Sequence, residues 1–360
     1  MKTQSKKPTR KPRKVGPIRR VRYLLEYIFL SRFSNLIGAL PEGAAARLGR
    51  FCGRLIYRLN KGRRGRAIRN IERALGSELT RDEVRQLARQ TFQSFGLTVT
   101  EMVWANQNLT PDELAERCPL EGAEPLEQAL ATGRGALLAS MHLGNWELFG
   151  ARCAYHFGEA TALARPPTNP YLAKRIARLR EKMGIKLLST LDGARPIVRA
   201  LKNGEWVGIL IDQHVRRAAA PALFFGHPAY TSTVVPSLAL RLKVPVFIGW
   251  DIRIGQTFEH RARIEGPVEL VRTGDHEADI LANTQLLNDL LEEKVREHPE
   301  QWYWHDRRWK SSERLERRAD SWDTEAEAKL QECHRPRKLL QEASANDKSK
   351  KCQEQEIEPP

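Results

Sequence analysis

The chain lacks the cysteine patterns that mark disulfide-stabilised and zinc-binding proteins. Its five cysteines, Cys52, Cys118, Cys153, Cys333 and Cys352, are scattered, odd in number and form no C-x-x-C pair. This spacing argues against a disulfide framework and against a zinc ribbon. We therefore expect reduced thiols that face the cytoplasm.

Several catalytic signatures are also missing. The sequence has no G-x-S-x-G elbow, no H-E-x-x-H pair, no G-x-x-x-x-G-K-[ST] loop and no G-x-G-x-x-G after a strand. These absences argue against serine hydrolases of that type, zinc peptidases, P-loop enzymes and dinucleotide-binding enzymes. No internal repeat occurs, and no histidine spacing indicates a metal site. We expect neither a metal nor a cofactor.

Acidic residues are absent from the N-terminus of a chain whose formal net charge is +16. Residues 1–22 contain ten lysines and arginines, and this basic arm is predicted to be disordered. The apolar segment 23–41 follows at once, which favours attachment to anionic membrane lipids. Because Glu26 and Arg32 are costly at a bilayer centre, we expect an interfacial helix. The alternative is a buried helix of a soluble domain.

The remaining chain alternates short apolar runs with helix-length segments, a rhythm typical of an α/β domain. Residues 43–104 are predicted to be helical. Beyond them, strands are predicted at 136–139, 161–164, 186–189, 206–211 and 244–250, and helices at 145–157, 170–183, 193–203, 233–242 and 276–297. The predicted fold is a central mixed β-sheet flanked by helices over residues 42–311. A charged, mostly disordered tail is expected over residues 312–360.

The segment His142-Leu-Gly-Asn-Trp-Glu147 directly follows the apolar run 135–140. On one regular helix the two end residues would stand about 140° apart and would not meet. If a helix begins near Asn145, however, His142 lies outside it and Glu147 falls in its first turn. A carboxylate on one imidazole nitrogen would let the other nitrogen deprotonate a hydroxyl. The alternative is an ordinary helix start, with Asn145 as N-cap.

Three polar residues follow three of the predicted strands: His142, Arg165 and Asp212. Ligands of α/β sheets bind outside the carboxyl ends of the strands. If these strands are neighbours, a base, a cation and a second carboxylate converge on one crevice. For Arg165 and Asp212, an exposed loop arginine and a turn-forming aspartate are the alternative interpretations.

Taken together, these features resemble the bacterial lipid A biosynthesis acyltransferases, the lauroyl and myristoyl transferases of the lysophospholipid acyltransferase superfamily. The resemblance runs from about Val21 to Lys310. It is carried by residues 20–26, Arg69-Asn-Ile-Glu-Arg-Ala-Leu75, His142-Leu-Gly-Asn-Trp-Glu147, Arg165-Pro-Pro-Thr-Asn-Pro170, Ile211-Asp-Gln213 and Pro299-Glu-Gln-Trp-Tyr-Trp-His-Asp-Arg-Arg-Trp-Lys310. The first catalytic block and the last block are the specific ones.

The resemblance implies a glycerolipid acyltransferase-like fold and an enzyme on the cytoplasmic face of the bacterial inner membrane. Such an enzyme moves a fatty acyl group from acyl carrier protein or acyl-CoA to a hydroxyl of a glycolipid such as a lipid A precursor. It implies that His142 is the general base and Glu147 its partner. Its substrate-binding residues here are Gly144, Asn145, Arg165, Asn169, Asp212, Gln213 and Arg307.

The expected mechanism is direct attack on the thioester without an acyl-enzyme. Backbone amides of residues 144–146 at a helix start are the predicted oxyanion donors. The expected partners are the acyl donor, the acceptor and membrane lipid, and no nucleic acid. Two alternatives stay open: the same chemistry on another glycolipid or phospholipid, and a membrane-tethered basic binding protein without catalysis.

Overall fold

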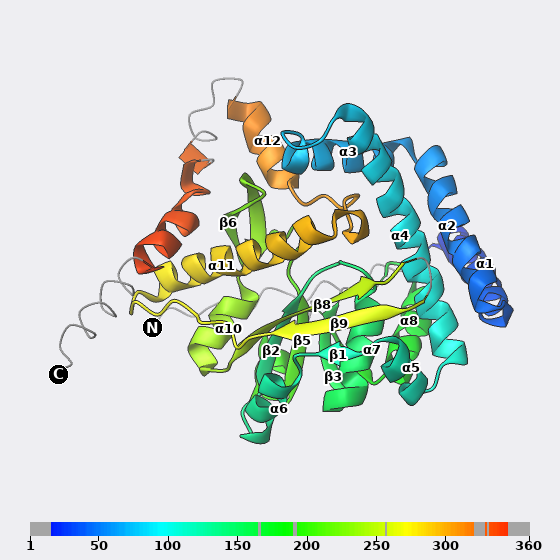
Figure 1. Ribbon diagram of the computed structural model, residues 1–360, viewed down its shortest axis with the longest axis horizontal. Helices are drawn as coiled ribbons and strands as arrows, with labels where there is room; N and C mark the ends of the chain where they lie inside the picture. The colour runs from blue at the N-terminus through cyan, green and yellow to red at the C-terminus, as the bar shows by residue number, and fades with distance from the viewer. Residues whose placement is uncertain are drawn as a thin grey trace.

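The computed structural model describes residues 16–164, 167–189, 193–255, 258–319, 328–329 and 331–344. One seven-stranded sheet lies at its centre, with helices packed around it (Figure 1). The N-terminal helices α1 and α2 lie together at one end of the molecule. Of the predicted basic arm, residues 1–15 lie outside the described residues.

The sheet has the strand order β1-β9-β8-β2-β5-β3-β4. Its strands are β1 (Leu120–Glu121), β2 (Ala136–Ser140), β3 (Ala160–Ala164), β4 (Ile185–Ser189), β5 (Trp206–Leu210), β8 (Val246–Arg253) and β9 (His260–Glu265). Neighbouring strands run parallel, except that β8 and β9 are antiparallel. The prediction of a mixed sheet is therefore confirmed, as are the five predicted strands.

Helices cover both faces of this sheet. They are α1 (Pro17–Ala39), α2 (Glu42–Leu59), α3 (Lys61–Leu75), α4 (Arg81–Asn108), α5 (Pro111–Arg117), α6 (Glu124–Ala131), α7 (Trp146–Phe157), α8 (Pro170–Lys182), α9 (Arg195–Lys202), α10 (Val234–Leu242), α11 (His276–Glu297) and α12 (Lys310–Ala319). The five helices predicted after residue 145 are all present, with ends within two residues of the prediction.

All five residues of β2 are buried, because successive side chains enter different cores. Leu137 and Ala139 belong to the core that α3, α4, α9, α10 and α11 cover. Ala136 and Leu138 belong to the core that α5, α6 and α7 cover. The central strand is thus sealed on both faces, and its carboxyl end is fixed in position.

The sequence did not predict the hairpin of β6 (Ala219–Phe224) and β7 (His227–Ser232), which forms a separate two-stranded sheet. The buried Arg308 holds it, because its guanidinium donates to the Tyr230 carbonyl at 3.2 Å and to Thr231 Oγ1 at 2.8 Å. Burial lowers the pKa of Arg308 to about 10. This arginine braces the hairpin and is not available to a ligand.

The structured part extends past the boundary expected at residue 311. Helix α12 lies against β7, and Glu316 on it accepts two hydrogen bonds of 2.7 Å from Arg73 of α3. Residues 328–329 and 331–344 contain further helical turns, and Arg337 donates to Asp289 of α11 at 2.5 Å. The rest of the expected tail, residues 320–327, 330 and 345–360, lies outside the described residues.

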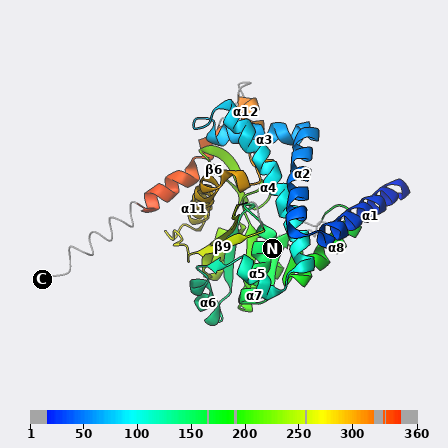
Figure 2. The same cartoon turned by 45° about the vertical axis from the view of Figure 1, so that its right-hand side comes forward.

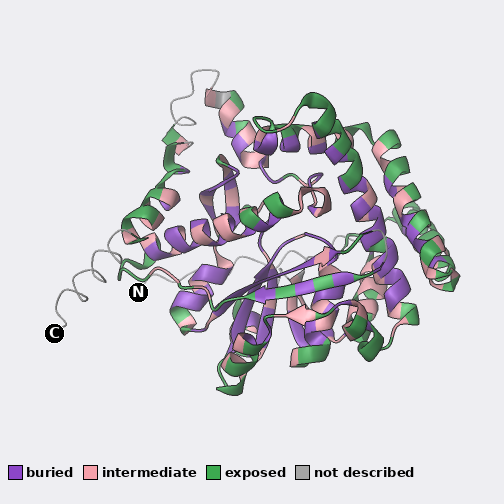
Figure 3. Ribbon diagram, viewed as in Figure 1, coloured by how far each residue is buried: buried purple, intermediate pink, exposed green. Residues whose placement is uncertain are grey.

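Helix α1 begins at Pro17, earlier than predicted, and projects beside α8 (Figure 2). Its inner side is tied to α4, where Trp104 donates to the Leu40 carbonyl at 2.9 Å and Gln107 donates to the Ser34 carbonyl at 3.2 Å. Its outer side is exposed, as is that of α2 (Figure 3). Large apolar side chains are exposed there: Ile18, Val21, Leu24, Leu25, Ile28, Phe29, Leu30, Leu36, Phe51, Leu55 and Leu59.

No helix in the described ranges has both the length and the apolar content needed to cross a bilayer.

Helices α2 and α4 approach each other closely at glycines. A Cβ built on Gly96 would lie 2.2 Å from the Gly49 carbonyl oxygen, and one on Gly53 would lie 2.2 Å from the Phe92 carbonyl oxygen. Neither backbone can yield easily, because both belong to long helices. Only glycine allows this packing.

We predict that Gly96→Ala lowers the free energy of unfolding by about 1–3 kcal/mol, because the added methyl group forces α2 and α4 apart. The measurement is urea denaturation of the wild type and the variant. The matched control is Gly62→Ala in the first turn of α3, where the nearest atom is 3.8 Å from the new Cβ. A Gly96 variant as stable as this control would contradict the close packing.

Candidate active site

His142 lies just beyond the carboxyl end of β2, in a loop that the rest of the chain holds on two sides. Its backbone N–H donates to Asp212 Oδ2 at 2.9 Å, and its carbonyl accepts from the Tyr303 N–H at 3.1 Å. Leu143 forms an antiparallel bridge with Trp302. The closing block of the sequence therefore runs alongside the histidine loop.

The imidazole of His142 is paired with Asp212. Its Nδ1 lies 2.8 Å from Asp212 Oδ1, while Asp212 Oδ2 also accepts a 2.8 Å hydrogen bond from Trp302 Nε1. The aspartate is buried, with 2% of its surface exposed. Strands β2 and β5 are parallel neighbours in which Ser140 pairs with Leu210. Each functional residue comes two positions after its strand, so the register brings them together.

This pairing sets the protonation of the imidazole. A carboxylate accepts the Nδ1 proton, which leaves Nε2 with a free lone pair. In this structure Gln213 Nε2 lies 3.1 Å from that nitrogen and donates to it. Burial alone would lower the pKa of His142, but the charge and hydrogen bond of Asp212 outweigh burial and raise it. His142 has the geometry of a base held by a carboxylate.

The predicted contact between His142 and Glu147 is wrong. Glu147 instead accepts two hydrogen bonds from Arg180 of α8, at 2.8 Å and 2.5 Å. The first turn of α7 directs its carboxylate toward α8, and the ring of Trp146 contacts His142, with ring centroids 4.8 Å apart. Glu147 acts on the imidazole only through its charge, which contributes to the raised pKa.

Asn145, for which a substrate contact was predicted, is fully buried, and its side chain is engaged within the fold. It caps α7, accepting from the Leu148 N–H at 3.2 Å, and its Nδ2 donates to Glu101 at 2.9 Å. The predicted oxyanion amides are also engaged elsewhere. The Gly144 N–H donates to the Gln301 carbonyl at 3.3 Å, and the Asn145 N–H donates to Asp251 Oδ2 at 2.8 Å.

A buried network of charged side chains fixes the position of the loop that carries His142. Asp251 Oδ2 also accepts from His260 Nδ1 at 2.7 Å, while the Glu101 carboxylate pairs with the guanidinium of Arg253. Burial opposes the charge on Glu101, but Arg253 and His260 outweigh it and hold the pKa of Glu101 at about 2. Burial likewise opposes the charge on His260, yet the two carboxylates raise its pKa to about 9.

Gly144 allows the loop to sit on this network. It has a φ of +56°, and a Cβ built on it would lie 2.1 Å from the Asp251 carbonyl oxygen. Its own carbonyl accepts a 2.8 Å hydrogen bond from Thr98 Oγ1 of α4. The contacts of Gly144 are all with the rest of the fold, so they assign it a role in the shape of the loop. Its predicted role in substrate binding stays a prediction.

The other predicted substrate-binding residues lie in different places. Asn169 is buried and caps α8, and its Nδ2 donates to the Tyr23 carbonyl at 2.9 Å and to Glu26 at 3.1 Å. It therefore joins α8 to α1 and does not reach His142. Arg165 lies outside the described residues. Gln213 contacts the imidazole, as given above, and Arg307 is exposed.

An apolar pocket opens beside the histidine loop. Its lining includes Ser140 at the end of β2, Trp146 and Glu147 of α7, and Gly208 of β5. Most of the remaining lining is apolar: Leu138, Phe149, Ala160, Ala162, Leu163, Ile185, Leu187, Trp206, Ile209 and Leu210. The buried hydroxyl of Ser140 has no hydrogen-bond partner in the described structure. A buried polar group without a partner therefore lines a mostly apolar pocket.

A basic cavity lies on the side of the closing block. Cations from α3, the loop after β5 and α12 line it together with one acid: Arg66, Arg69, Arg216, Arg307, Lys310, Glu313, Arg314 and Arg317. Arg66 donates to the His305 carbonyl at 3.1 Å, and the pKa of Arg66 is lowered by burial and by neighbouring cations such as Arg307. Among the described residues, no group of His, Cys, Asp and Glu is arranged to hold a metal ion.

Sequence reasoning missed the closing block's part in the site. Trp302 donates to Asp212, Tyr303 bonds the His142 backbone, and Gln301 bonds Gly144. Residues 299–310 contain three tryptophans, which indicates a buried segment. Their number does not indicate which strand end the segment contacts.

Comparison with known proteins agrees with this geometry. The profile of the bacterial lipid A biosynthesis acyltransferases matches residues 17–311. The chain belongs to this family. It is therefore an acyltransferase.

Relatives of this acyltransferase are named for two kinds of lipid, lipid A and phosphatidylinositol mannoside. It is 28% identical over 283 residues to the lipid A biosynthesis lauroyltransferase of Escherichia coli, covering 77% of this chain and 88% of the relative. It is 25% identical over 277 residues to the palmitoleoyltransferase of the same organism, covering 76% and 87%. It is 23% identical over 304 residues to the phosphatidylinositol mannoside acyltransferase of Mycolicibacterium smegmatis, covering 79% and 91%.

We predict that Asp212→Asn in this acyltransferase lowers the pKa of His142, because the substitution removes the negative charge and the carboxylate hydrogen bond that raise it. The pKa is measured by NMR titration of the imidazole. The acidic limb of the kcat/KM profile should move to lower pH with it.

The control is Glu147→Gln, which removes the charge of a carboxylate that is hydrogen-bonded to Arg180 and not to the His142 imidazole. Its downward shift should be smaller than that of Asp212→Asn. Equal shifts in both variants would mean that the Asp212 contact does not control the titration of His142.

Proposed function

We propose that the protein transfers a fatty acyl group from an acyl thioester to a hydroxyl of a glycolipid such as a lipid A precursor. The observation that carries the proposal is the pairing of His142 Nδ1 with Asp212 Oδ1 at 2.8 Å, in a loop whose neighbours Ser140 and Trp146 line the apolar pocket. His142 is the general base, and Asp212 takes the orienting role that the sequence had suggested for Glu147.

The reaction requires the acceptor hydroxyl to displace Gln213 from Nε2. As Nε2 takes the hydroxyl proton, the oxygen attacks the thioester carbonyl and forms a tetrahedral oxyanion. Collapse of that intermediate breaks the carbon–sulfur bond, and the imidazolium returns its proton to the departing sulfur. Asp212 stabilises the imidazolium between the two proton transfers. No acyl-enzyme is needed.

Two side chains are suited to the oxyanion, since the Gly144 and Asn145 amides are engaged elsewhere. The Ser140 hydroxyl has no partner in the described structure and lines the apolar pocket. The Gln213 amide is released when the acceptor displaces it from His142. A donor directed at developing charge in a site without water contributes strongly to catalysis. We assign Ser140 and Gln213 this role.

The apolar pocket is suited to the acyl chain. Most of its walls are aliphatic and aromatic side chains of β2, β3, β4, β5 and α7, and we place the thioester beside Ser140 and Trp146, the lining residues that flank His142 in sequence. The ion pair of Glu147 and Arg180 closes part of its rim. An acyl chain enclosed there leaves its thioester carbon near His142.

The basic cavity is suited to anionic groups of the acceptor. Seven cations and a single carboxylate line it, and the cavity adjoins the closing block that contacts the His142 loop. Guanidinium groups bind phosphate through two parallel hydrogen bonds. We therefore retain Arg307 as a substrate-binding residue, and we propose a phosphorylated glycolipid as acceptor.

The proposed location is the cytoplasmic side of the bacterial inner membrane. The exposed apolar side chains of α1 and α2 support it, because a row of such side chains on one face is typical of helices that lie in the membrane interface. The basic arm over residues 1–22 would add attraction to anionic lipid. Acyl carrier protein, which is acidic, is the donor favoured by the net charge of +16.

We predict that His142→Ala lowers acyl transfer at least ~100-fold, because the general base is lost. The assay follows a labelled acyl group from acyl carrier protein, or from CoA, into a total lipid extract. The control is His156→Ala, whose ring pairs with Glu127 on the surface at the far end of α7 and should leave the rate unchanged.

Label in a single glycolipid would also identify the acceptor. Transfer that is indifferent to His142, or no transfer with either donor, would reject the proposed mechanism and favour a binding protein. A steep salt dependence of nucleic-acid binding that vanishes on deleting residues 1–22 would indicate a nucleic-acid partner instead.

We further predict that Gly208→Val shifts the enzyme toward shorter acyl chains. A Cβ at this position contacts only Trp206, at 3.6 Å, so the new side chain fills pocket space without a backbone clash. Competition between donors of about sixteen and about eight carbons measures the preference, which should change about tenfold or more. An equal loss with both donors would indicate that the acyl chain does not reach Gly208.

A further inference from the structure

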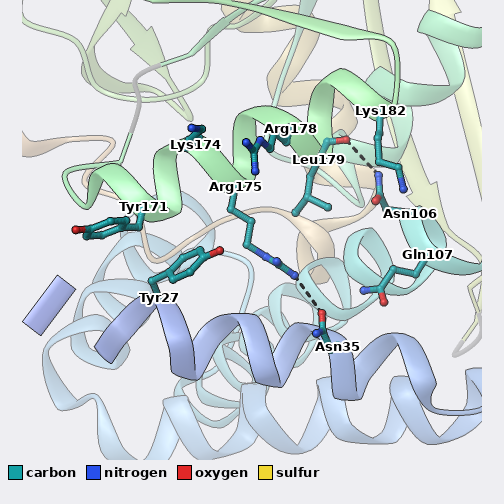
Figure 4. Close-up of a pocket in the computed structure, with 10 residues that line it drawn as sticks. All are labelled: Tyr27, Asn35, Asn106, Gln107, Tyr171, Lys174, Arg175, Arg178, Leu179 and Lys182. Atoms are coloured by element: carbon teal, nitrogen blue, oxygen red, sulfur yellow. Dashed lines mark hydrogen bonds between the residues drawn. The ribbon is translucent and has the colours of Figure 1, made fainter. Parts of the chain in front are cut away.

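A cleft between α1 and α8 carries charge of one sign and takes no part in the proposed chemistry. We define this α1–α8 cleft by six of its lining residues, Tyr27, Asn35, Tyr171, Lys174, Arg175 and Arg178; Lys182 extends its basic wall. No acidic side chain lines it. Figure 4 shows Arg175 of α8 reaching across the opening to Asn35 of α1.

The cleft is built into the fold. The guanidinium of Arg175 donates to Ser34 Oγ at 3.0 Å and to Asn35 Oδ1 at 3.4 Å, which ties α8 to α1 (Figure 4). On the opposite wall, Asn106 of α4 donates to the Leu179 carbonyl at 3.1 Å. Three of the four cations, Lys174, Arg178 and Lys182, are exposed and make no ion pair with a described residue. Their charge is available to an anion.

The cleft lies along the flank of the exposed apolar face of α1. At 100° per residue, Asn35 falls about 20° from Ile28 and about 40° from Val21 around the helix axis, and Tyr27 falls about 100° from Ile28. If that apolar face enters a bilayer, the cleft stands at the depth of the headgroups. Tyr27 and Tyr171, with ring centroids 5.9 Å apart, stand at this boundary, and tyrosines are enriched at membrane–water interfaces.

We propose that the α1–α8 cleft binds the phosphate of an anionic phospholipid in the membrane on which the enzyme sits. Tyr27 and the apolar face of α1 would contact the acyl region, while Lys174, Arg178 and Lys182 would contact the headgroup. The inference rests on the membrane attachment proposed above and is independent of acyl transfer. An acidic protein would be attracted by the same charges, but the adjoining exposed apolar face of α1 favours a lipid over a charged protein surface.

The test is sedimentation of the full chain with vesicles of phosphatidylcholine alone, or with about 30% phosphatidylglycerol, at physiological salt. The combined variant Lys174→Gln, Arg178→Gln and Lys182→Gln should bind the anionic vesicles at least tenfold more weakly. Its binding to neutral vesicles should not change, since the apolar face is intact. A variant that keeps the charges, Lys174→Arg, Arg178→Lys and Lys182→Arg, should bind as the wild type does.

The matched control removes three exposed cations from α9: Arg195→Gln, Arg199→Gln and Lys202→Gln. It should weaken binding less than threefold. Equal weakening by both triple variants would overturn the site, because net charge alone would explain it. Unchanged vesicle binding with weakened binding of acyl carrier protein would also overturn it, and would assign the cleft to the donor.

Acyl transfer to acceptor dispersed in a neutral detergent separates this proposal from the enzymatic one. The α8 triple variant should retain wild-type transfer there, whereas His142→Ala should not. Loss of transfer in the α8 variant under these conditions would overturn its role as a lipid site outside the reaction centre.

Discussion

The active site depends on the register between two parallel strands. Strand β2 pairs with β5 so that Ser140 lies opposite Leu210, and the Ile211 N–H still donates to the Ser140 carbonyl at 3.0 Å. His142 follows β2 and Asp212 follows β5, so the two residues lie side by side just beyond the edge of the sheet. A shift of one residue would turn the side chains of β5 to the opposite face of the sheet. The apolar residues of β2 and β5 that fill the two cores thus also fix the distance between base and carboxylate.

The loop that follows β2 is held in place by charged side chains that are buried from water. Glu101, Arg253, Asp251 and His260 are all buried, and each is paired with opposite charge within the group. Removal of one member would leave a partner charged in an apolar surrounding, which is far more costly than the loss of a single hydrogen bond. Because Glu101 comes from α4 and Asp251 from β8, the network fastens the Asn145 N–H and side chain to two separate elements. Helix α4 also packs against α1 and α2, so the N-terminal helices and the site share one rigid support.

The sequence predicted five strands of the central sheet, five of the helices after residue 145 and the convergence of His142 and Asp212 at two strand ends, because all of these follow from local apolar periodicity and the geometry of parallel sheets. It failed on the partner of His142. Glu147 is five residues away and was chosen for that closeness, whereas Asp212 is seventy residues away and is brought close only by strand pairing. The same limit applies to Asn145 and Gly144, whose residue types are equally suited to ligand binding and to capping a helix or turning a loop. The hairpin β6–β7 was missed because tertiary contacts with Arg308 and α11 hold it, and no alternation in its own sequence marks it.

Helix α8 separates two environments that a lipid-modifying enzyme has to bring together. On one side, Arg180 pairs with Glu147 at the rim of the apolar pocket. On the other, Lys174, Arg175 and Arg178 line the basic cleft against α1. No residue of α8 is fully buried. Polar contacts tie the helix to its neighbours on both sides, through Arg175 to α1 and through Arg180 to α7. If both proposals hold, the headgroup cleft and the acyl pocket share α8, through Lys174 and Arg178 on one side and Arg180 on the other.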